Sequence, residues 1–416
     1  MSKEELENIK NELDELIISL KKEQQNNVPE MPKVFFENEK PVVYKEKTED
    51  EIKLQQEIEK EKSKENKEEQ KVKNKKNKKT KKKSKKWVVT FATLDIIAII
   101  CIFLMYGPIA YFRNLWVTSA MTTMTHKYLA YIFFNQEQID EIMSNNIVIE
   151  VQGETNQDEI EFEEEKEEVI VYSSPEEEQV LKKDEGNDVY KVIDIEGDGY
   201  KGHMLVVYDP SKIKLEKVPN MKYGRTLDQF MSKTGAVAGI NASGFNYSEY
   251  SGYSFSGTVI IKGQIVANNS STGWGGGIIG FTNDNVLVLT KASAYEALNM
   301  GIRDAVSFGP FLIVNGVPSQ FKGNGGYGIA PRTAIGQRKD GIVLMLVIDG
   351  RRPGHSLGVD MVELTNIMLK YGAYNASNLD GGGSSTFYAN GKILSVAGGS
   401  GYEGDRYLPN AWLVYE

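Results

Sequence analysis

The sequence predicts an α+β fold: a mixed β-sheet domain with a local βαβ unit, preceded by one transmembrane helix and a disordered or helical tail. Three observations lead to this prediction. Residues 191–416 alternate short β-rich stretches with glycine-rich turns. One amphipathic helical pattern interrupts them at residues 359–371. Ahead of this domain, residues 87–112 form a long apolar run.

The strands of the domain follow from residue type. Apolar and β-branched residues dominate the predicted strands HMLVVYD (203–209), GTVIIKGQIV (257–266), NVLVLT (285–290) and GIVLMLVID (341–349). The last segment is continuously apolar, which is typical of a strand buried on both faces.

The helix predicted at residues 359–371 has apolar side chains near helical spacing. Ser356 is its candidate N-cap, and Gly372 suits the position after the last turn. A short strand, NASNLD (375–380), follows the helix. Strand, helix and strand together predict the βαβ unit.

Residues 87–112 read WVVTFATLDIIAIICIFLMYGPIAYF and carry one charge, Asp95. A membrane span needs about 20 apolar residues, so this run predicts a transmembrane helix. A buried core helix and a cleavable signal peptide are the alternatives, and 86 preceding residues disfavour the second. Asp95 is expected to pair, to stay protonated or to contact another helix.

Lysines crowd the segment Lys71–Lys86, directly before the apolar run, whereas few basic residues follow it. The positive-inside rule therefore predicts a single-pass cell-membrane protein with a cytoplasmic N-terminus and an extracellular C-terminal domain. These lysines are expected to bind anionic membrane lipids.

Two further segments flank the apolar run. The cytoplasmic tail, residues 1–86, is rich in lysine and glutamate, which predicts disorder for most of it. Heptad spacing of leucine and isoleucine within residues 3–24 predicts either weak self-association or a lone amphipathic helix. Residues 113–190 predict a juxtamembrane helix followed by an acidic stalk.

Charge and cysteine content exclude several classes of protein. Acidic residues (58) outnumber lysine and arginine (49), mainly after the apolar run, which disfavours nucleic-acid binding. The single cysteine, Cys101, excludes an intrachain disulfide and a multi-cysteine zinc site. We expect no cofactor, while the sequence leaves open whether a metal ion joins the acids described next.

Two carboxylates directly follow predicted strands: Asp349 in VIDGR and Asp380 in NLDGGGSSTF. If these strands are parallel neighbours, both acids emerge at the same sheet edge, where sites of α/β units form. Paired carboxylates serve glycosyl transfer, one as acid or base and one as nucleophile or stabiliser. Asp-Gly is also an ordinary turn signal, so neither residue is decisive alone.

Gly381, Gly382 and Gly383 precede Ser384 and Ser385. Successive glycines let the backbone approach a ligand and point its N–H groups at one anion. The segment lacks both GK[ST] and GxGxxG, so it is neither a P-loop nor a dinucleotide fingerprint. We interpret it as a phosphate-binding loop.

Five of the eight arginines lie between Arg303 and Arg352. Guanidinium groups bind phosphate and carboxylate bidentately, so this cluster predicts an anion site. Arg332, in the turn-like APRT, is the strongest candidate, and Arg351 follows Asp349 closely.

His355 lies close to Asp349 in sequence and is either a proton donor to a leaving group or a surface loop residue. His203, within a strand, is predicted to be a packing or edge residue. Ser384, His355 and Asp349 would form a Ser-His-Asp triad, but GGGSS is not the GxSxG nucleophile elbow.

Five motifs follow one another along residues 190–416. They are GINASGFN (239–246), AVSFGPFLIVNG (305–316), APRTAIG (330–336), VIDGRRPGHSLGVDMVEL (347–364) and NLDGGGSST (378–386). In this order they resemble the phosphodiester glycosidase family. The resemblance implies hydrolysis of a sugar-1-phosphodiester at the anomeric carbon, which releases a sugar and a phosphomonoester.

Motif matching implies a site made of Asn241, Arg332, Asp349, Arg351, Asp380, Gly382 and Ser384. Arg332 and the amides of Gly381–Gly383 would hold the phosphate, and Asp349 or Asp380 would face the anomeric carbon. A phosphate monoester leaves readily, so charge stabilisation is expected to matter more than a dedicated general acid.

The predicted topology suggests a bacterial cell surface, where envelope glycans or exopolysaccharide would be the substrates. A non-catalytic envelope-polysaccharide binding or assembly module is the alternative, and it would not depend on the carboxylates. A third interpretation is a lipid-surface scaffold that acts through residues 1–86.

Overall fold

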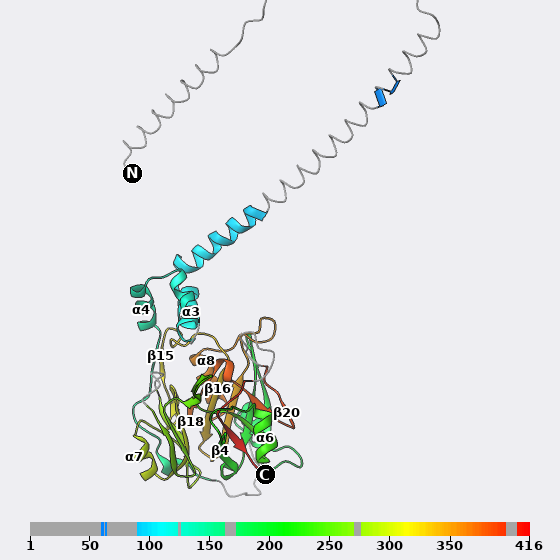
Figure 1. Ribbon diagram of the computed structural model, residues 1–416. Coiled ribbons are helices and arrows are strands. Elements are labelled where there is room, and N and C mark those ends of the chain that lie inside the picture. The colour runs from blue at the N-terminus through cyan, green and yellow to red at the C-terminus, as the bar shows by residue number, and fades with distance from the viewer. Residues whose placement is uncertain are drawn as a thin grey trace, which may run out of the picture. The chain divides into compact units, whose positions relative to one another are not determined.

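A computed structural model describes residues 60–61, 63–64, 90–123, 126–162, 172–269, 276–396 and 406–416. The predictions for residues 3–24 and for Lys71–Lys86 lie outside these ranges. The described part is α+β, as predicted, with several β-sheets and a few short helices (Figure 1).

A seven-stranded sheet carries the predicted βαβ unit. In spatial order its strands are β14 (Val317–Pro318), β13 (Phe311–Val314), β18 (Ala373–Asn378), β16 (Arg332–Arg338), β17 (Val343–Ile348), β3 (Tyr200–Val207) and β2 (Tyr190–Gly197). Each recorded pairing in it is antiparallel.

Two five-stranded sheets complete the main framework. One has the order β11 (Leu287–Thr290), β10 (Gly277–Thr282), β12 (Ile302–Phe308), β8 (Thr258–Ile261) and β9 (Gln264–Asn268). The other has the order β20 (Lys392–Ile393), β19 (Phe387–Ala389), β5 (Ala238–Asn241), β21 (Asn410–Val414) and β4 (Ile213–Lys217). Two small sheets pair β1 (Ile147–Ile149) with β15 (Gln320–Lys322), and β6 (Phe245–Ser248) with β7 (Gly252–Phe255).

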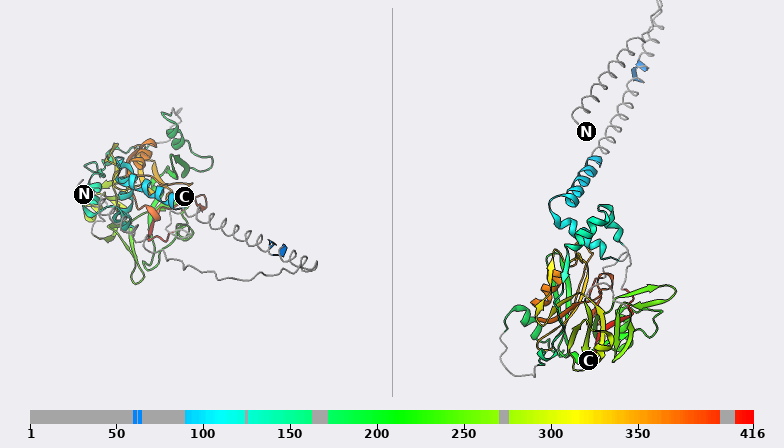
Figure 2. Two further views of the ribbon diagram at one scale, coloured as in Figure 1. Left: turned by 90° about the horizontal axis from the view of Figure 1, so that it is seen from above. Right: turned by 90° about the vertical axis from the view of Figure 1, so that its left-hand side faces the viewer.

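Apart from the helix Thr90–Tyr106, the helices are short and lie around these sheets (Figure 2). The α-helices are α3 (Ala110–Met121), α4 (Gln136–Ser144), α5 (Pro175–Leu181), α6 (Leu227–Thr234), α7 (Ala294–Asn299) and α8 (Met361–Lys370). The 3-10 turns are η1 (Lys127–Ile132), η2 (Gln157–Glu159), η3 (Pro210–Lys212) and η4 (Gly382–Ser384).

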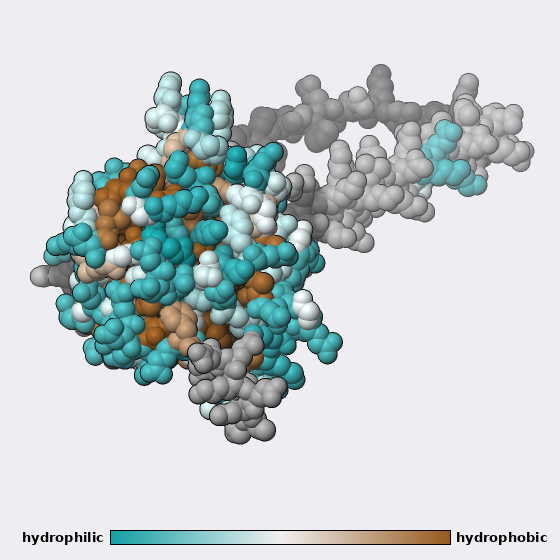
Figure 3. Space-filling view, turned by 90° about the horizontal axis from the view of Figure 1, so that it is seen from below, coloured by the Kyte–Doolittle hydropathy of each residue, from teal (hydrophilic) through white to brown (hydrophobic). Residues whose placement is uncertain are grey.

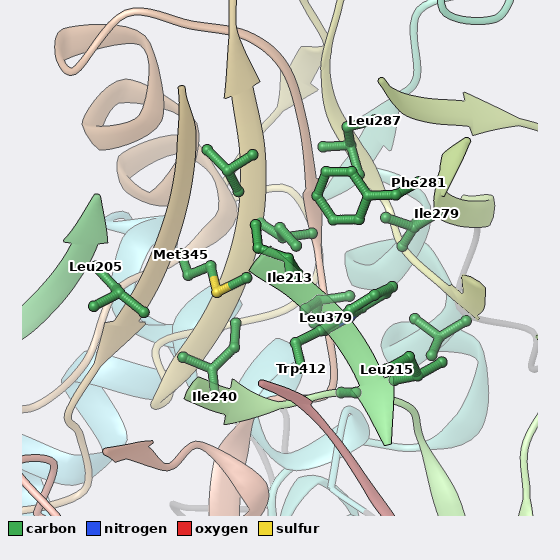
Figure 4. Close-up of a cluster of buried hydrophobic side chains, with 14 of the residues drawn as sticks. Leu205, Ile213, Leu215, Ile240, Ile279, Phe281, Leu287, Met345, Leu379 and Trp412 are labelled. Atoms are coloured by element: carbon green, nitrogen blue, oxygen red, sulfur yellow. The ribbon is translucent and has the colours of Figure 1, made fainter. Parts of the chain in front are cut away.

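The main core lies between the sheets. Figure 4 shows Trp412 of β21, Phe281 of β10 and Met345 of β17 pointing into one cluster. The rings of Trp412 and Phe281 meet edge to face, with centroids 5.6 Å apart. This cluster joins all three large sheets, so it fixes their mutual arrangement.

The seven-stranded sheet is buried on both faces. Alternate residues of β17, such as Met345 and Val347, enter the main core, whereas Leu344 and Leu346 enter a second cluster. Helix α8 covers that second face with Leu364 and Met368 (Figure 1). Double burial explains why this strand is continuously apolar, and the prediction for residues 341–349 is confirmed.

The predicted segment at residues 257–266 is two strands rather than one. It turns at Lys262 and Gly263, both with positive φ, so β8 and β9 form a hairpin. Two such residues in succession are typical of a tight hairpin turn.

Helix α8 begins one turn later than the predicted cap requires. Asp360 is its N-cap, and its side chain accepts a hydrogen bond from the N–H of Glu363. Ser356 was therefore the wrong candidate: its hydroxyl donates to the carbonyl of Asp349 at 2.6 Å. Gly372 lies just past the helix with φ near +82°, as predicted.

Residues 147–162 and 172–181 pack onto the domain rather than forming the expected stalk. Strand β1 pairs with β15, the Thr155 N–H donates to Leu289 O, and Ile160 enters an apolar cluster. Val180 of α5 is fully buried against the seven-stranded sheet. Within the described residues, the folded domain therefore begins well before residue 191.

Among the described residues, no single helix is long and apolar enough to cross a membrane. Helices Thr90–Tyr106 and Ala110–Met121 are long and apolar enough only when taken together, and the chain bends by 86° at the break between them.

Candidate active site

The predicted site residues converge at one edge of the seven-stranded sheet. Strands β17 and β18 both run antiparallel to β16, so they are parallel to each other. Arg332, at the start of β16, lies opposite Ile348, one residue before Asp349. Asp380 follows β18 at the same edge, so the shared edge is confirmed. The two parallel strands are not neighbours, however, because β16 lies between them.

Asp380 is half-buried and directly precedes the 381–383 loop. Burial raises its pKa to about 6, whereas a hydrogen bond from Ser384 and the positive charge of Arg406 lower it. The carboxyl group therefore titrates near neutral pH, which is a common property of catalytic acids.

The loop after Asp380 folds into the 3-10 turn η4, with Gly382 at a φ near +62°. The Gly382 N–H donates to the carbonyl of Pro331 at 2.8 Å. This amide is engaged within the protein, so the prediction that all three glycine amides face a phosphate is wrong for Gly382. Ser384 is buried, and its hydroxyl accepts a hydrogen bond from Nη1 of Arg406 at 3.0 Å.

Asn241 holds this loop from behind. Its Nδ2 donates to the carbonyl of Asp380 at 2.6 Å, and its Oδ1 accepts from Thr333 Oγ1 and from the Thr386 N–H. The same Thr333 hydroxyl lies 3.2 Å from the hydroxyl of Ser385. Asn241 is only 1% exposed, so the geometry favours a positioning role over the direct substrate contact that we predicted.

Three arginines lie beside the 381–383 loop, two of them with their guanidinium groups against it. A Cβ atom at Gly382 would lie 3.4–3.7 Å from the guanidinium of Arg351. A Cβ at Gly383 would lie 3.7 Å from Nη1 of Arg406, and one at Gly381 would lie 3.9 Å from Cδ of Arg332. The glycines thus admit three cations to one loop, which creates a positive site for an anion.

Arg332 is buried, and three backbone carbonyls fix its guanidinium. Nε donates to Val359 O at 3.1 Å, and Nη2 donates to Tyr327 O and Gly328 O at 2.8 and 2.6 Å. Burial lowers its pKa to about 10, and the charge of Arg351 acts in the same direction. Asp360 opposes this shift. Within the described residues, Arg332 makes no ion pair, so its charge remains available to a ligand.

Arg351 adopts a left-handed backbone conformation, with φ near +57°. This conformation is uncommon for a residue other than glycine, and residues that adopt it are often found at functional sites. Its side chain reaches solvent, although desolvation by the surrounding protein lowers its pKa.

Two other arginines of the sequence cluster, Arg303 and Arg338, do not join this site. Arg303 pairs with Asp304 and also donates to Ile213 O at 2.8 Å. Arg338, at the opposite end of β16, pairs with Asp340 at 2.7 Å. Proximity in sequence was misleading because β16 carries its first and last residues to opposite sheet edges.

Buried Asp349 pairs with the partly exposed His355 at the site edge. Nε2 of His355 lies 2.7 Å from Oδ2 of Asp349, and the other carboxylate oxygen accepts from the Val396 N–H at 2.9 Å. Asp349 is 2% exposed, whereas the His355 side chain is 37% exposed. Asp349 therefore orients a histidine that still reaches solvent.

A Ser-His-Asp triad requires a hydrogen bond between Ser384 and His355, and the described residues do not show one. The recorded hydrogen bonds of the Ser384 side chain join it to Arg406 and Asp380, and none among the described residues joins it to His355. Hydrolysis by a serine nucleophile is therefore not supported by this arrangement.

His203 lies outside the site. Its Nδ1 lies 2.8 Å from a carboxylate oxygen of Asp194, opposite it on β2, and its ring packs 5.5 Å from that of Phe387. This agrees with the predicted packing role. In the described part of the chain, no group of three or more histidine, cysteine, aspartate or glutamate residues could hold a metal ion.

Sequence reasoning missed Arg406. It lies alone in the stretch GDRYLPN, far from the other site residues in sequence, so no motif marked it. Its guanidinium stacks 4.7 Å from the ring of Phe245, in one of the five motifs. The only signal in the sequence was that arginine is rare: the chain has eight, so each was a candidate for anion binding.

Residues 234–415 match the family model for phosphodiester glycosidases. The chain is 37% identical over 84 residues to the N-acetylglucosamine-1-phosphodiester alpha-N-acetylglucosaminidase of Bos taurus, across 20% of this chain and 14% of that protein. It is 29% identical over 167 residues to an uncharacterized SPbeta prophage-derived protein of Bacillus subtilis, across 38% of this chain and 25% of that protein. The chain thus spans a quarter or less of the length of these relatives.

Two solved structures are also similar. The catalytic domain of the zebrafish N-acetylglucosamine-1-phosphodiester alpha-N-acetylglucosaminidase, auto-inhibited by its pro-peptide, aligns with a TM-score of 0.46 and 20% identity, over 56% of this chain and 85% of that chain. A putative exported protein from Burkholderia pseudomallei aligns with a TM-score of 0.39 and 16% identity, over 52% of this chain and 74% of that chain.

The family match covers the edge site and includes all five sequence motifs in full, from residue 239 to residue 386. The resemblance inferred from these motifs is therefore confirmed. Over residues 234–415, the chain is similar to the phosphodiester glycosidase family.

Proposed function

We propose that this protein hydrolyses glycosyl-1-phosphodiesters and releases a sugar and a phosphomonoester. One observation carries the proposal: Asp380, whose burial raises its pKa to about 6, directly precedes a glycine loop that lies beside Arg332, Arg351 and Arg406. A phosphodiester supplies the anion for the arginines, and its anomeric carbon supplies the developing positive charge for the carboxylate.

The charges divide between the two halves of the reaction. Arg332, Arg351 and Arg406 neutralise the phosphate as the glycosidic bond breaks, which makes it a better leaving group. Ionised Asp380 stabilises the oxocarbenium-like sugar, either through space or by covalent attack.

His355 is the proposed proton-transfer group. Asp349 holds its ring through Nε2, which leaves Nδ1 to face solvent or substrate. A base oriented in this way activates a water molecule for attack on the sugar. This proposal assigns Asp380 to the anomeric carbon and Asp349 to the orientation of His355, a choice that the sequence left open.

The substrate class follows from the relatives only in outline. N-acetylglucosamine-1-phosphodiesters are the first compounds to test, because the bovine relative is named for them. Envelope glycans or exopolysaccharide remain the proposed natural substrates, on a bacterial cell surface.

Membrane anchoring remains part of the proposal. Side chains on helix Thr90–Tyr106 such as Phe91, Ile99 and Phe103 are more than half exposed, so the described residues give this apolar helix little cover. A bilayer would bury them, with Lys71–Lys86 against anionic headgroups on the cytoplasmic side.

The test measures free sugar released by the full chain from a panel of N-acetylglucosamine-1-phosphodiesters. Asp380→Asn should lower turnover by about two to three orders of magnitude, as loss of a stabilising group does. Asp194→Asn, at an exposed carboxylate paired with His203, is the matched control and should match wild type. Full turnover by Asp380→Asn would overturn the mechanism. Wild-type binding of envelope polymers without turnover would instead favour a non-catalytic binding module.

A further inference from the structure

A glycine-rich segment, residues 323–328, connects the helices after the apolar run to the active site. Gly323, Gly325, Gly326 and Gly328 all have positive φ, between about 59° and 81°. Side chains rarely adopt this conformation, so the segment follows a path that other residues would resist.

The glycines bring this segment against α3 and the end of α4. A Cβ at Gly328 would lie 2.6 Å from the backbone N and Cα of Ser119 in α3. A Cβ at Gly323 would overlap the side chain of Asn146, and one at Gly326 would overlap the backbone oxygen of the same residue. The backbones therefore touch, and Figures 1 and 2 show α3 at this end of the domain.

Buried polar contacts fix the register of this junction. Nδ2 of Asn324 donates to Thr118 Oγ1 at 2.9 Å, and Oδ1 of Asn146 accepts from the Asn324 N–H at 3.0 Å. Thr118 is fully buried, and Asn146 is 1% exposed. Buried hydrogen bonds of this kind specify one arrangement, because each broken bond leaves an unpaired polar group.

The far side of the segment holds the active-site arginine. Two of the three carbonyls that bind the Arg332 guanidinium belong to Tyr327 and Gly328. Within the described residues no carboxylate pairs with Arg332, so these neutral carbonyls determine where its charge lies.

We propose that α3 and Asn146 position Arg332 for catalysis through the 323–328 segment. The helices that follow the apolar run are then part of the catalytic unit and not a passive connection to it. Thr118 and Asn146 act as positioning residues, since neither contacts the site directly. The catalytic readout of this inference rests on the proposed phosphodiester hydrolysis.

The test compares three full-chain variants at the end of α3. Thr118→Val keeps the shape but removes the acceptor for Asn324, and Thr118→Ser restores it. Thr123→Val is the matched control, because the hydrogen bonds of the Thr123 hydroxyl to described residues are local, to Ala120 O and from the His126 N–H. Thr118→Val should lower kcat/KM by about five-fold or more, as coupled residues do, while the other two variants stay near wild type.

Two further readouts separate positioning from general stability. In an Arg332→Ala background, Thr118→Val should cause no additional loss, because its effect passes through Arg332. Hydrogen exchange at residues 323–332 should rise in Thr118→Val and stay unchanged in Thr123→Val. Additive losses, or faster exchange with unchanged kcat/KM, would overturn the inference.

Absence of turnover in wild type would refute the proposed function without deciding this inference. Affinity for N-acetylglucosamine-1-phosphate then replaces kcat/KM as the readout. Weaker binding by both Thr118→Val and Arg332→Ala, with recovery in Thr118→Ser, would support positioning. Wild-type affinity in Thr118→Val, or no binding by any form, would overturn it.

Discussion

The surroundings of Asp380 shift the pKa of its carboxyl group in opposite directions. Burial raises its pKa to about 6, and the hydrogen bond from Ser384 and the charge of Arg406 oppose that rise. Because the ionised form stabilises a cationic transition state, kcat/KM should increase as pH rises through about 6 and then level off. A pH–rate profile checks this. A decrease above pH 6 would instead identify Asp380 as the general acid.

The same carboxyl group should make the fold less stable as pH rises. Its folded-state pKa exceeds the ordinary value of 3.8, so between these two values the folded chain holds a proton that the unfolded chain has lost. Unfolding is therefore increasingly favoured from about pH 4 to about pH 6. Asp380→Asn should reduce this dependence and unfold at higher denaturant concentration than wild type at pH 7. Equal midpoints at pH 7 would show that the site does not destabilise the fold.

Arg406 links the phosphate site to the carboxylate. Removing its charge in Arg406→Ala should raise the pKa of Asp380 further, so the ascending limb of the pH–rate profile moves to higher pH. Arg406→Lys keeps a positive charge but loses the paired donors, and should retain most of the wild-type pH dependence. An unshifted limb in Arg406→Ala would mean that the two groups do not interact in solution.

Helix α8 depends on its cap. Asp360→Ala removes the acceptor for the Glu363 N–H and should lower the free energy of unfolding by about 1 kcal/mol. Asp360→Asn retains an acceptor and should restore most of that stability. Chemical denaturation of both variants checks this prediction, and equal losses would assign the effect to charge beside Arg332 instead of capping.

Local patterns in the sequence predicted individual strands and helices. The continuous apolar run identified β17, the helical spacing identified α8, and the Asp-Gly pairs marked the ends of β17 and β18. The insertion of β16 between those strands was not predictable in this way. It depends on pairing between segments distant in sequence, and register is set by the whole sheet.

For the site residues too, local sequence patterns were informative and contacts between distant segments were not predictable. Asp349 and Asp380 were found because each follows a predicted strand, the 381–383 loop because of its successive glycines, and Arg332 because it lies in a turn-like segment of an arginine cluster. Arg406 was missed because only tertiary packing against Phe245 brings it to Ser384. The sequence cluster of arginines also contains Arg303 and Arg338, which lie away from the site, because the sequence does not show which end of a strand faces the ligand.

The acidic segment after the apolar run shows how composition alone can mislead. Its net charge predicted a stalk, yet Ile160 and Val180 are buried against the sheets. Isolated apolar residues within a charged stretch give no strong periodic signal. On the face of the domain shown in Figure 3, hydrophobic side chains appear in separate areas among hydrophilic ones.

A fragment that begins at residue 191 should therefore be much less stable than one that begins at residue 93. It lacks Val180 and Ile160, and it leaves β15 without its partner β1. The two apolar side chains alone contribute about 3 kcal/mol or more by burial. Denaturation of both fragments measures the difference.

A fragment from residue 172, which restores α5 only, should recover the part due to Val180. Equal midpoints for all three would mean that residues 93–190 are a separate unit, and the helices before the domain could then not position Arg332.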